Sequence, residues 1–267
     1  MINDITIGQY YPTDSVIHKL DPRTKIVSAF LYIIFLFTVN NVWGYLAAFI
    51  FLAAVVIVSK IPAGYVIKGI KGILFIMLLT VVINMFWTPG EIVWQWKFLK
   101  ITKEGIQLSF NMAFRLVLLI SGTSMMTLCT DTISLTDGME ELIKKMPFVG
   151  KYAHELSMMM SIALRFIPTL TEETDRIMKA QKSRGADFET GGIFARAKGL
   201  IPILVPLFVS AFQRANELAM AMEARCYRGA EGRTRLKELK YTKGDFAAYG
   251  IVVLCMAAIF ATRFVAF

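Results

Sequence analysis

The stretch that decides the fold is IVSAFLYIIFLFTVNNVWGYLAAFIFLAAVVIVS, residues 26–59, a run of 34 residues without one Asp, Glu, Lys or Arg. A membrane-spanning helix needs about 20 predominantly apolar residues, so this run is too long for one ordinary span. Asn40-Asn41, Trp43 and Gly44 lie in its middle. Asn and Gly favour a turn and Trp favours the membrane interface, so we predict a helical hairpin. One long tilted helix is the alternative.

The rest of the chain has the composition of an integral membrane protein. Hydrophobic residues make up 56% and charged residues 18%, and the mean hydropathy is +0.56. A typical soluble domain has about 25% charged residues, so a plain soluble enzyme and a disordered chain are both excluded. Three further apolar windows predict spans at residues 72–88, about 106–129 and 246–264. The predicted fold class is therefore an all-α integral membrane protein with about five transmembrane helices.

Basic residues set the predicted orientation. Three precede the first span and three follow the second, whereas the turn between these spans carries none: Lys19, Arg23, Lys25, Lys60, Lys68 and Lys71. Cytoplasmic loops carry an excess of Lys and Arg, so we expect the N-terminus on the cytoplasmic side of a cytoplasmic membrane. Residues 91–104 then lie outside, although three lysines there oppose the rule. Their alternation of aromatic and polar residues predicts a short strand or hairpin.

Residues 131–245 differ sharply from the rest, because they hold 18 of the 29 Lys and Arg and 15 of the 20 Asp and Glu. We expect a helical cytoplasmic coupling domain with two long amphipathic helices, about 152–184 and 194–228, kinked or broken at internal prolines. The predicted domains are 1–130 (membrane), 131–245 (cytoplasmic) and 246–267 (final span). Residues 199–213 are charge-free and remain open: a buried or interfacial helix is expected, and a span is the alternative.

Several classes of site are improbable from composition. Cys129, Cys226 and Cys255 are widely spaced, and His18 and His154 are too few for a histidine-based metal site, so no bound metal or cofactor is expected. The net charge of +9 fits basic membrane loops, and no interleaving of basic and aromatic residues points to nucleic acid. The charge-free windows lack Asp, Glu and His, which argues against an intramembrane enzyme.

A short element occurs twice in the charged region. Residues 180–187 and 224–231 share the pattern A-x-x-x-R-G-A-[DE] at an offset of 44 residues. A glycine just past a helix and an Arg near its C-terminus are ordinary helix capping, which explains either copy alone. Two matching copies also fit a pair of arginine fingers, each forming a bidentate pair with a carboxylate on one of two similar partner subunits. Both interpretations stay open on the residues alone.

The sequence resembles the transmembrane T components (EcfT) of energy-coupling-factor transporters, a class of ABC-type importers. The resemblance rests on H-x-L-D-P-R-T-K at residues 18–25, on Ser183-Arg184-Gly185 and Tyr227-Arg228-Gly229, and on the order of hydrophobic and charged segments over the whole chain. It implies a non-catalytic subunit that binds two ABC ATPase subunits, similar or identical, and a membrane-embedded S component. It also implies that ATP and Mg are bound by the ATPases and not by this chain. The lipid bilayer is a further partner.

The resemblance implies which residues take part. The expected ATPase-coupling residues are Ser183, Arg184, Gly185, Ala186, Tyr227, Arg228, Gly229 and Ala230. Methionines suit adaptable binding surfaces, and they suggest a surface for S components, with packing of a core as the alternative. These methionines are Met158, Met159, Met160, Met178, Met220 and Met222. We therefore expect a module shared among several S components for vitamins or other micronutrients; a dedicated cobalt or nickel importer is the alternative.

Overall fold

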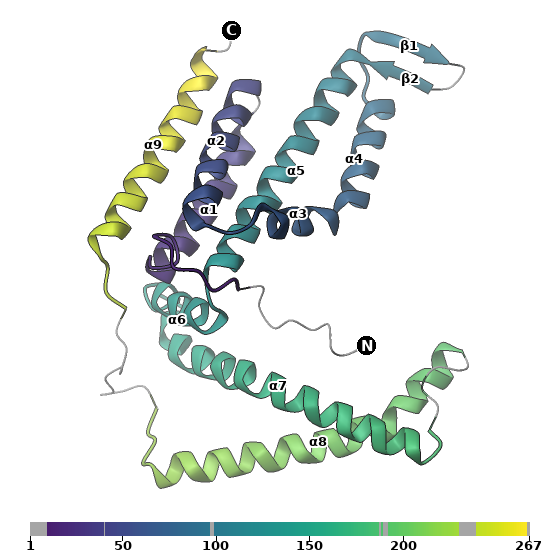
Figure 1. Ribbon diagram of the computed structural model, residues 1–267, viewed down its shortest axis with the longest axis vertical. Helices are drawn as coiled ribbons and strands as arrows, with labels where there is room; N and C mark the ends of the chain where they lie inside the picture. Colours follow the sequence, from purple (N-terminus) through teal and green to yellow (C-terminus); the bar gives the residue numbers. More distant parts are fainter. Residues whose placement is uncertain are drawn as a thin grey trace. The chain divides into compact units, whose positions relative to one another are not determined.

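The computed structural model describes residues 10–39, 41–96, 99–186, 188, 192–229 and 239–265. Within them lie helices and one two-stranded hairpin (Figure 1). The elements are α1 (Pro22–Thr38), α2 (Val42–Ser59), α3 (Ala63–Lys71), α4 (Leu74–Trp87), β1 (Ile92–Trp96), β2 (Leu99–Thr102), α5 (Lys103–Cys129), α6 (Thr132–Ile143), α7 (Ala153–Ser183), α8 (Ile193–Ala224) and α9 (Lys243–Val265). The predicted all-α membrane fold is confirmed.

The described residues divide into two compact units. We name residues 10–139 with 239–265 the bundle unit, and residues 140–229 the arm unit. The bundle unit contains α1 to α5 and α9, and the arm unit contains α7 and α8.

The helical hairpin predicted for residues 26–59 is present. Helix α1 ends at Thr38, and α2 begins at Val42 after Asn41, which has an extended backbone. The hairpin at residues 91–104 is also present, as antiparallel β1 and β2 with a register shift between Ile92 and Trp94. Polar residues such as Asn41 separate α1 from α2, because a polar group without a hydrogen-bond partner costs free energy in the hydrocarbon core of a membrane.

The span predicted at residues 72–88 is shorter and bent. Helix α4 has only 14 residues, and it forms a broken pair with α3 at an angle of 59°. Helices α2, α5, α8 (from Lys198) and α9 (to Ala261) are long and apolar enough to cross a membrane, and the α3–α4 pair is a fifth candidate. Helix α1 has 17 residues, near the lower limit for a span.

A ring of four helices forms the core of the bundle unit. Helix α1 packs against α5 and α9, and α2 packs against the same two helices. Leu36, Ala48 and Leu118 are almost completely buried where these helices meet. Small and aliphatic side chains allow helices to approach closely in a membrane, where packing replaces the hydrophobic effect as the force that associates helices.

The Arg115 side chain reaches the C-terminal end of α1. Its guanidinium donates a hydrogen bond of 2.7 Å to the Val39 carbonyl, to which the Tyr45 hydroxyl also donates at 3.2 Å. Val39 follows the last residue of α1, where helix carbonyls have no intrahelical partner. Arg115 and Tyr45 therefore satisfy the C-terminal end of α1.

The H-x-L-D-P-R-T-K segment packs at the start of α1. His18 Nε2 donates to the Tyr11 carbonyl at 3.0 Å, and the Ser15 hydroxyl lies 2.7 Å from His18 Nδ1. Burial lowers the pKa of His18, which favours the neutral imidazole that this pattern needs. Asp21 is the N-cap of α1 and accepts from the Arg23 N–H, with Pro22 at the first helical position, as the sequence predicts.

The same segment also holds the start of α9. The Asp21 N–H donates to Asp245 Oδ1 at 2.8 Å, and Asp245 Oδ2 accepts from the N–H and the hydroxyl of Thr242 at 2.7 Å each. Arg23 pairs with Asp21 at 2.8 Å and stacks on the Tyr241 ring at 4.1 Å. Asp245 is completely buried. One carboxylate thus joins the starts of two helices that are distant in sequence.

The four tryptophans of the chain lie at one edge of the bundle unit. Trp43 is at the start of α2, Trp87 ends α4, and Trp94 and Trp96 belong to β1. Figure 1 shows these element ends on the same side of the unit, opposite the start of α1. Tryptophan concentrates at the membrane–water interface, so this edge fits one face of the bilayer.

Candidate functional site

The arm unit is built around a crossing of its two long helices. Glu173 of α7 accepts a hydrogen bond of 2.6 Å from the Ser210 hydroxyl and forms an ion pair of 2.8 Å with Arg214, both on α8. A second contact, from the Gln181 side chain to the Pro202 carbonyl, spans 3.5 Å. The positions along each helix show that α7 and α8 cross in antiparallel directions.

This crossing places the two helix C-termini at opposite ends of the arm unit. Figure 1 shows α7 and α8 diverging from the crossing, with the end of α7 on one side and the end of α8 on the other. The helices are continuous, although Pro168 lies inside α7 and Pro202 and Pro206 lie inside α8. Of the two expected effects of these prolines, a kink or a break, the break is therefore wrong, and the kink stays a prediction. Continuous helices of 31 and 32 residues can act as stiff levers.

The end of α7 presents Arg184 on a well-formed cap. Arg184 is the C-cap residue and is exposed. The Gly185 N–H bonds to the Lys182 carbonyl, and the Ala186 N–H bonds to the Gln181 carbonyl, at 3.0 Å each. Gly185 has a φ of +86°, in the left-handed region that glycine adopts without steric cost. This arrangement is a Schellman motif, which fixes the backbone on both sides of Arg184.

The end of α8 differs from the expected one. Helix α8 stops at Ala224, and the same Schellman pattern forms with Cys226 as the left-handed residue, at a φ of +56°. The Cys226 N–H bonds to the Glu223 carbonyl at 2.9 Å, and the Tyr227 N–H to the Met222 carbonyl at 3.0 Å. The helix therefore ends before Arg228, and the prediction of a helix to residue 228 is wrong.

Arg228 consequently lies in a non-helical segment beyond the cap, and it is exposed. Gly229 has a φ of +87°, so the sequence-equivalent glycines share the left-handed conformation although only Gly185 caps a helix. Of the other expected coupling residues, Ser183 ends α7 and Tyr227 follows the α8 cap, whereas Ala230 lies outside the described residues.

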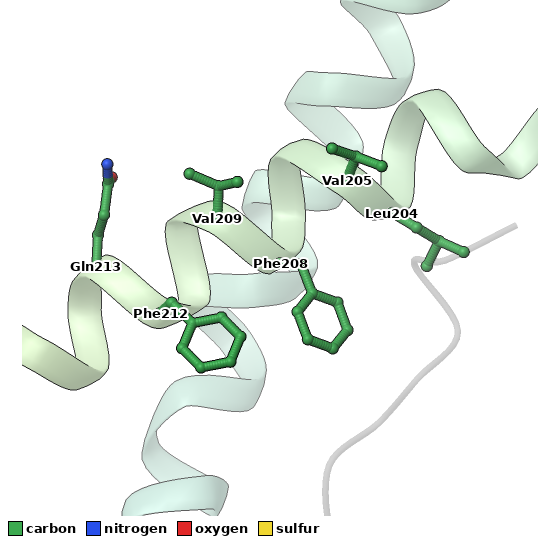
Figure 2. Close-up of a pocket in the computed structure, with 6 residues that line it drawn as sticks. All are labelled: Leu204, Val205, Phe208, Val209, Phe212 and Gln213. Atoms are coloured by element: carbon green, nitrogen blue, oxygen red, sulfur yellow. The ribbon is translucent and has the colours of Figure 1, made fainter.

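An apolar groove of about 450 Å³ follows one side of α8. Figure 2 shows its lining side chains, all from α8: Leu204, Val205, Phe208, Val209, Phe212 and Gln213. The five apolar residues each expose more than half of their surface, and the Phe208 and Phe212 rings lie 5.7 Å apart. Contiguous exposed apolar surface on a protein marks a site for a protein partner or for lipid.

The six methionines lie on both long helices of the arm unit. Met158, Met159 and Met160 lie near the start of α7, and Met220 and Met222 lie near the end of α8, which are the parts of the helices that diverge. Met178 lies on α7 near its end. Met159, Met160 and Met220 are exposed, and the other three are partly buried. These residues therefore do not form one continuous patch.

The described residues contain no group of three or more His, Cys, Asp or Glu side chains that could hold a metal ion. Their two closest acid–base contacts, Glu173 with Arg214 and Asp21 with Arg23, are used for packing helices. The surfaces that stand out are thus two arginine-bearing helix ends and an apolar groove, which suit binding of partners.

Comparisons with known proteins identify relatives of this chain. A family model described as "Cobalt transport protein" matches residues 13–236. A protein of Ruminiclostridium cellulolyticum, named energy-coupling factor transporter transmembrane protein EcfT, is 52% identical over 267 residues, covering 100% of both chains. Proteins of the same name from Acidaminococcus fermentans and Bacillus subtilis are 55% and 44% identical, covering 98% of this chain each and 97% and 100% of theirs. The chain belongs to this family.

Membership in the EcfT family confirms the resemblance seen in the sequence. The relatives are named as transmembrane proteins of a transporter, so the expected class of a non-catalytic membrane transport subunit is confirmed. The H-x-L-D-P-R-T-K signature acts structurally in this family member, because Asp21, Arg23 and Lys25 are buried contacts within the bundle unit.

Two features of this EcfT chain were not predicted from its sequence. The Glu173–Arg214 pair joins residues 41 apart on different helices, which helical periodicity cannot reveal. The groove on α8 does have a signal, because Leu204, Phe208 and Phe212 recur every four residues in the charge-free stretch 199–213. The sequence left that stretch open as a candidate span, and the structure shows that one of its faces forms the exposed groove.

The Glu173 contacts predict how the crossing responds to pH. Hydrogen bonding from Ser210, followed by Arg214, lowers the pKa of Glu173 below its usual range. A carboxylate with a lowered folded-state pKa stabilises the fold above its unfolded pKa, and this stabilisation is lost as the pH falls through the folded value. We therefore expect the crossing to stay intact through the range in which an ordinary glutamate titrates and to loosen only at lower pH.

Spin labels at position 160, near the start of α7, and at position 220, near the end of α8, report the distance between these two parts. The labels are placed in a variant without the native cysteines, and the distance is measured by double electron–electron resonance. We expect a narrow distance distribution that broadens only in strong acid, and a broad one at every pH in Glu173→Gln. Glu172→Gln is the matched control, since Glu172 is the exposed neighbouring carboxylate. Equal distributions in both variants would contradict a role for the Glu173 contacts.

Proposed function

We propose that this chain transmits ATP-driven motion of two ATPase subunits to a membrane-embedded S component during import of a micronutrient. The observation that carries the proposal is the crossed pair of long helices, each leading to an exposed arginine next to a left-handed glycine. The Glu173 contacts hold the crossing, so displacement of one helix end would move the other helix. ATP and Mg are bound by the ATPases in this proposal.

Arg184 and Arg228 are proposed to anchor the two ATPases. A guanidinium forms two parallel hydrogen bonds with a carboxylate, which fixes direction as well as distance. The neighbouring residues of each signature, Ser183 to Ala186 and Tyr227 to Ala230, would complete each contact. Two similar signatures fit two similar or identical subunits.

The α8 groove is proposed as the main contact for the S component. Its apolar lining suits a hydrophobic membrane protein better than the charged surface of a soluble ATPase. Exposed methionines lie on both helices, Met159 and Met160 near the start of α7 and Met220 near the end of α8, and their flexible side chains would adapt to different S components. We propose on this basis that the module is shared, and that vitamins are among its substrates.

The proposed orientation has the N-terminus in the cytoplasm. The basic residues at the start of α1, Lys19, Arg23 and Lys25, support it. The arm unit, which carries the ATPase contacts, would then lie on the cytoplasmic side as residues 131–245 of the predicted coupling domain. A dedicated cobalt importer is the second candidate, because the matching family model carries the description of a cobalt transport protein.

The test is a pull-down of the tagged protein from its native membrane, with mass spectrometry of the proteins that accompany it. ATPases together with several small hydrophobic proteins support a shared module. ATPases with one constant small membrane protein support a dedicated importer. Absence of any ATPase would contradict the proposal.

Phe212→Asp is expected to lower the amount of S component in that pull-down at least about 30-fold, with the amount of ATPase unchanged. The reason is that a charge in the groove loses a contact of the kind that contributes about 2 kcal/mol or more to binding. Phe194→Asp is the control, because Phe194 is a more exposed phenylalanine of α8 outside the groove lining. If both variants keep their S components, the groove is not the docking surface.

A further inference from the structure

The four-helix ring of the bundle unit is hollow over half of its length. A cavity of about 390 Å³ lies between α1, α2, α5 and α9, and all four helices line it. This volume falls within the roughly 300–1,000 Å³ of ordinary ligand sites. Protein interiors normally pack to the density of organic crystals, with few voids larger than a water molecule. A cavity of this size that opens to the outside of the bundle unit can therefore receive an apolar occupant.

Small side chains on α1, α2 and α9 produce the cavity. The far half of the ring is filled by large residues such as Leu36 and Leu118, and the Tyr32 and Phe51 rings, 6.0 Å apart, close off the cavity there. Gly122 of α5 lies at this closed end, because a Cβ atom there would meet the Tyr32 ring. In the near half, the lining includes six residues with little or no side chain: Ser28, Ala29, Ala54, Gly244, Ala247 and Ala248.

The cavity has the depth of one leaflet. On α1 its lining runs from Thr24 to Tyr32, and on α9 from Gly244 to Val252. Eight helical residues rise about 12 Å, against roughly 15 Å for half of a 30 Å hydrocarbon core. The cavity is open at its rim, where Ile251 exposes 61% of its surface. A lipid chain can therefore enter from the side.

The polar groups of the cavity lie near the start of α1 and offer hydrogen-bond donors. Lys25 Nζ donates to the His18 and Cys129 carbonyls at 2.9 Å each, which leaves its third N–H for another acceptor. The Ser28 Oγ is sealed even from a water molecule, so it does not face the cavity, and Lys25 is the residue that offers the donor. Lys25 is the one charged residue among those that line the cavity. The occupant therefore combines an apolar chain with an acceptor at one end.

We propose that this cavity binds one acyl chain of a membrane phospholipid, with an ester or phosphate oxygen at Lys25. The chain fills the space that the small residues leave between α1 and α9. The lipid then acts as a structural part of the four-helix ring, on the side of the bilayer where α1 begins. This site is independent of the α8 groove and of the two arginine-bearing ends.

The proposal is tested with the full chain in nanodiscs that contain phosphatidylglycerol carrying a diazirine in the middle of one acyl chain. After photolysis, mass spectrometry maps the labelled residues. We expect labelling concentrated in residues 24–32, 122–129 and 244–252, above the level on the exposed face of α4. Labelling of exposed faces without these three segments would overturn the proposal.

Variants that fill the cavity sharpen the test. Ala248→Leu, or Ala29→Leu from the opposite helix, should reduce labelling of the three segments at least 5-fold without changing labelling of α4. Ala257→Leu is the matched control, because Ala257 is an exposed alanine of α9 outside the lining. Unchanged labelling in well-folded Ala248→Leu would overturn the proposal. Displacement of the label by free fatty acid but not by unlabelled phosphatidylglycerol would overturn the phospholipid as the source.

Discussion

Replacing Arg184 by alanine is expected to abolish transport and to reduce co-purification of ATPases, while membrane insertion stays normal. Removing one partner of a buried charge pair costs about 2–5 kcal/mol, which corresponds to a loss of affinity of roughly 30-fold or more. Arg228→Ala is expected to have a loss of the same order, because the two ends act together on one transporter. The measurements are uptake of the transported substrate and the amount of ATPase bound to the purified protein.

Matched controls separate the arginine contact from net charge. Lys179→Ala removes a positive charge from an exposed position of α7, and Arg225→Ala does so at the cap of α8. We expect both variants to bind ATPases normally. Arg184→Lys should retain only part of the binding, since an ammonium cannot form the bidentate pair. An Arg184→Ala protein that binds ATPases and transports normally would show that the Arg-Gly element is only a helix cap.

The two arginines are presented differently, which affects how each one binds. Arg184 sits on a capped helix end, so little backbone freedom is lost when it binds. Arg228 lies beyond a cap made by Cys226, and a residue other than glycine in the left-handed conformation costs roughly 1 kcal/mol. Continuation of α8 to Arg228 would relieve this cost and place Gly229 as Gly185 is placed. The repeat in the sequence thus describes two ends that are equivalent in residues and unequal in this structure.

How much of this fold the sequence reveals depends on the range of the contacts involved. The hairpin of α1 and α2 is predictable, because Asn41 and Gly44 interrupt a run that is otherwise too apolar to leave the membrane. The bend between α3 and α4 is not, because Gly72 is a weak signal within an apolar window. The early end of α8 is also hidden, since a left-handed Cys226 contradicts its own conformational preference.

Long-range polar pairs account for the other failures of sequence reasoning. Glu173 and Glu217 match in the repeat, yet only Glu173 contacts Arg214 in the crossing, and Glu217 is exposed. The apolar face of α8 can be predicted from the four-residue periodicity of its side chains. The sequence does not show whether this face is buried in the protein, contacts lipid or binds a partner, and the structure shows that its side chains are exposed. Asp245 is a further example, because its sequence position suggests a charged linker and the structure places it in the core.

Asp245→Ala is expected to be the most destabilising single substitution in the bundle unit. Its carboxylate accepts the N–H of Asp21 and both the N–H and hydroxyl of Thr242, and it is completely buried. The Thr242 N–H contact is one half of a capping box at the start of α9. Alanine leaves three donors without an acceptor and removes the link between the starts of α1 and α9. Thr242 is exposed, so its donors can turn to water, and the Asp21 N–H is the buried one of the three. One buried unsatisfied donor costs about 1–3 kcal/mol and a lost cap about 1 kcal/mol, so a total loss of about 2–4 kcal/mol is expected.

The measurement is thermal unfolding of the detergent-purified protein, followed by fluorescence-detected size exclusion. A loss of 3 kcal/mol corresponds to a fall in Tm of roughly 6–12 °C for a protein of this size. Asp245→Asn should be nearly as harmful, because its amide N–H₂ would face the N–H of Thr242 or of Asp21 in place of an acceptor oxygen. Asp14→Ala is the control, since the Asp14 side chain is 96% exposed and makes only a long surface contact with Lys19. If Asp245→Ala unfolds at the wild-type temperature, the polar link does not hold α9 to α1, and packing along the two helices is sufficient.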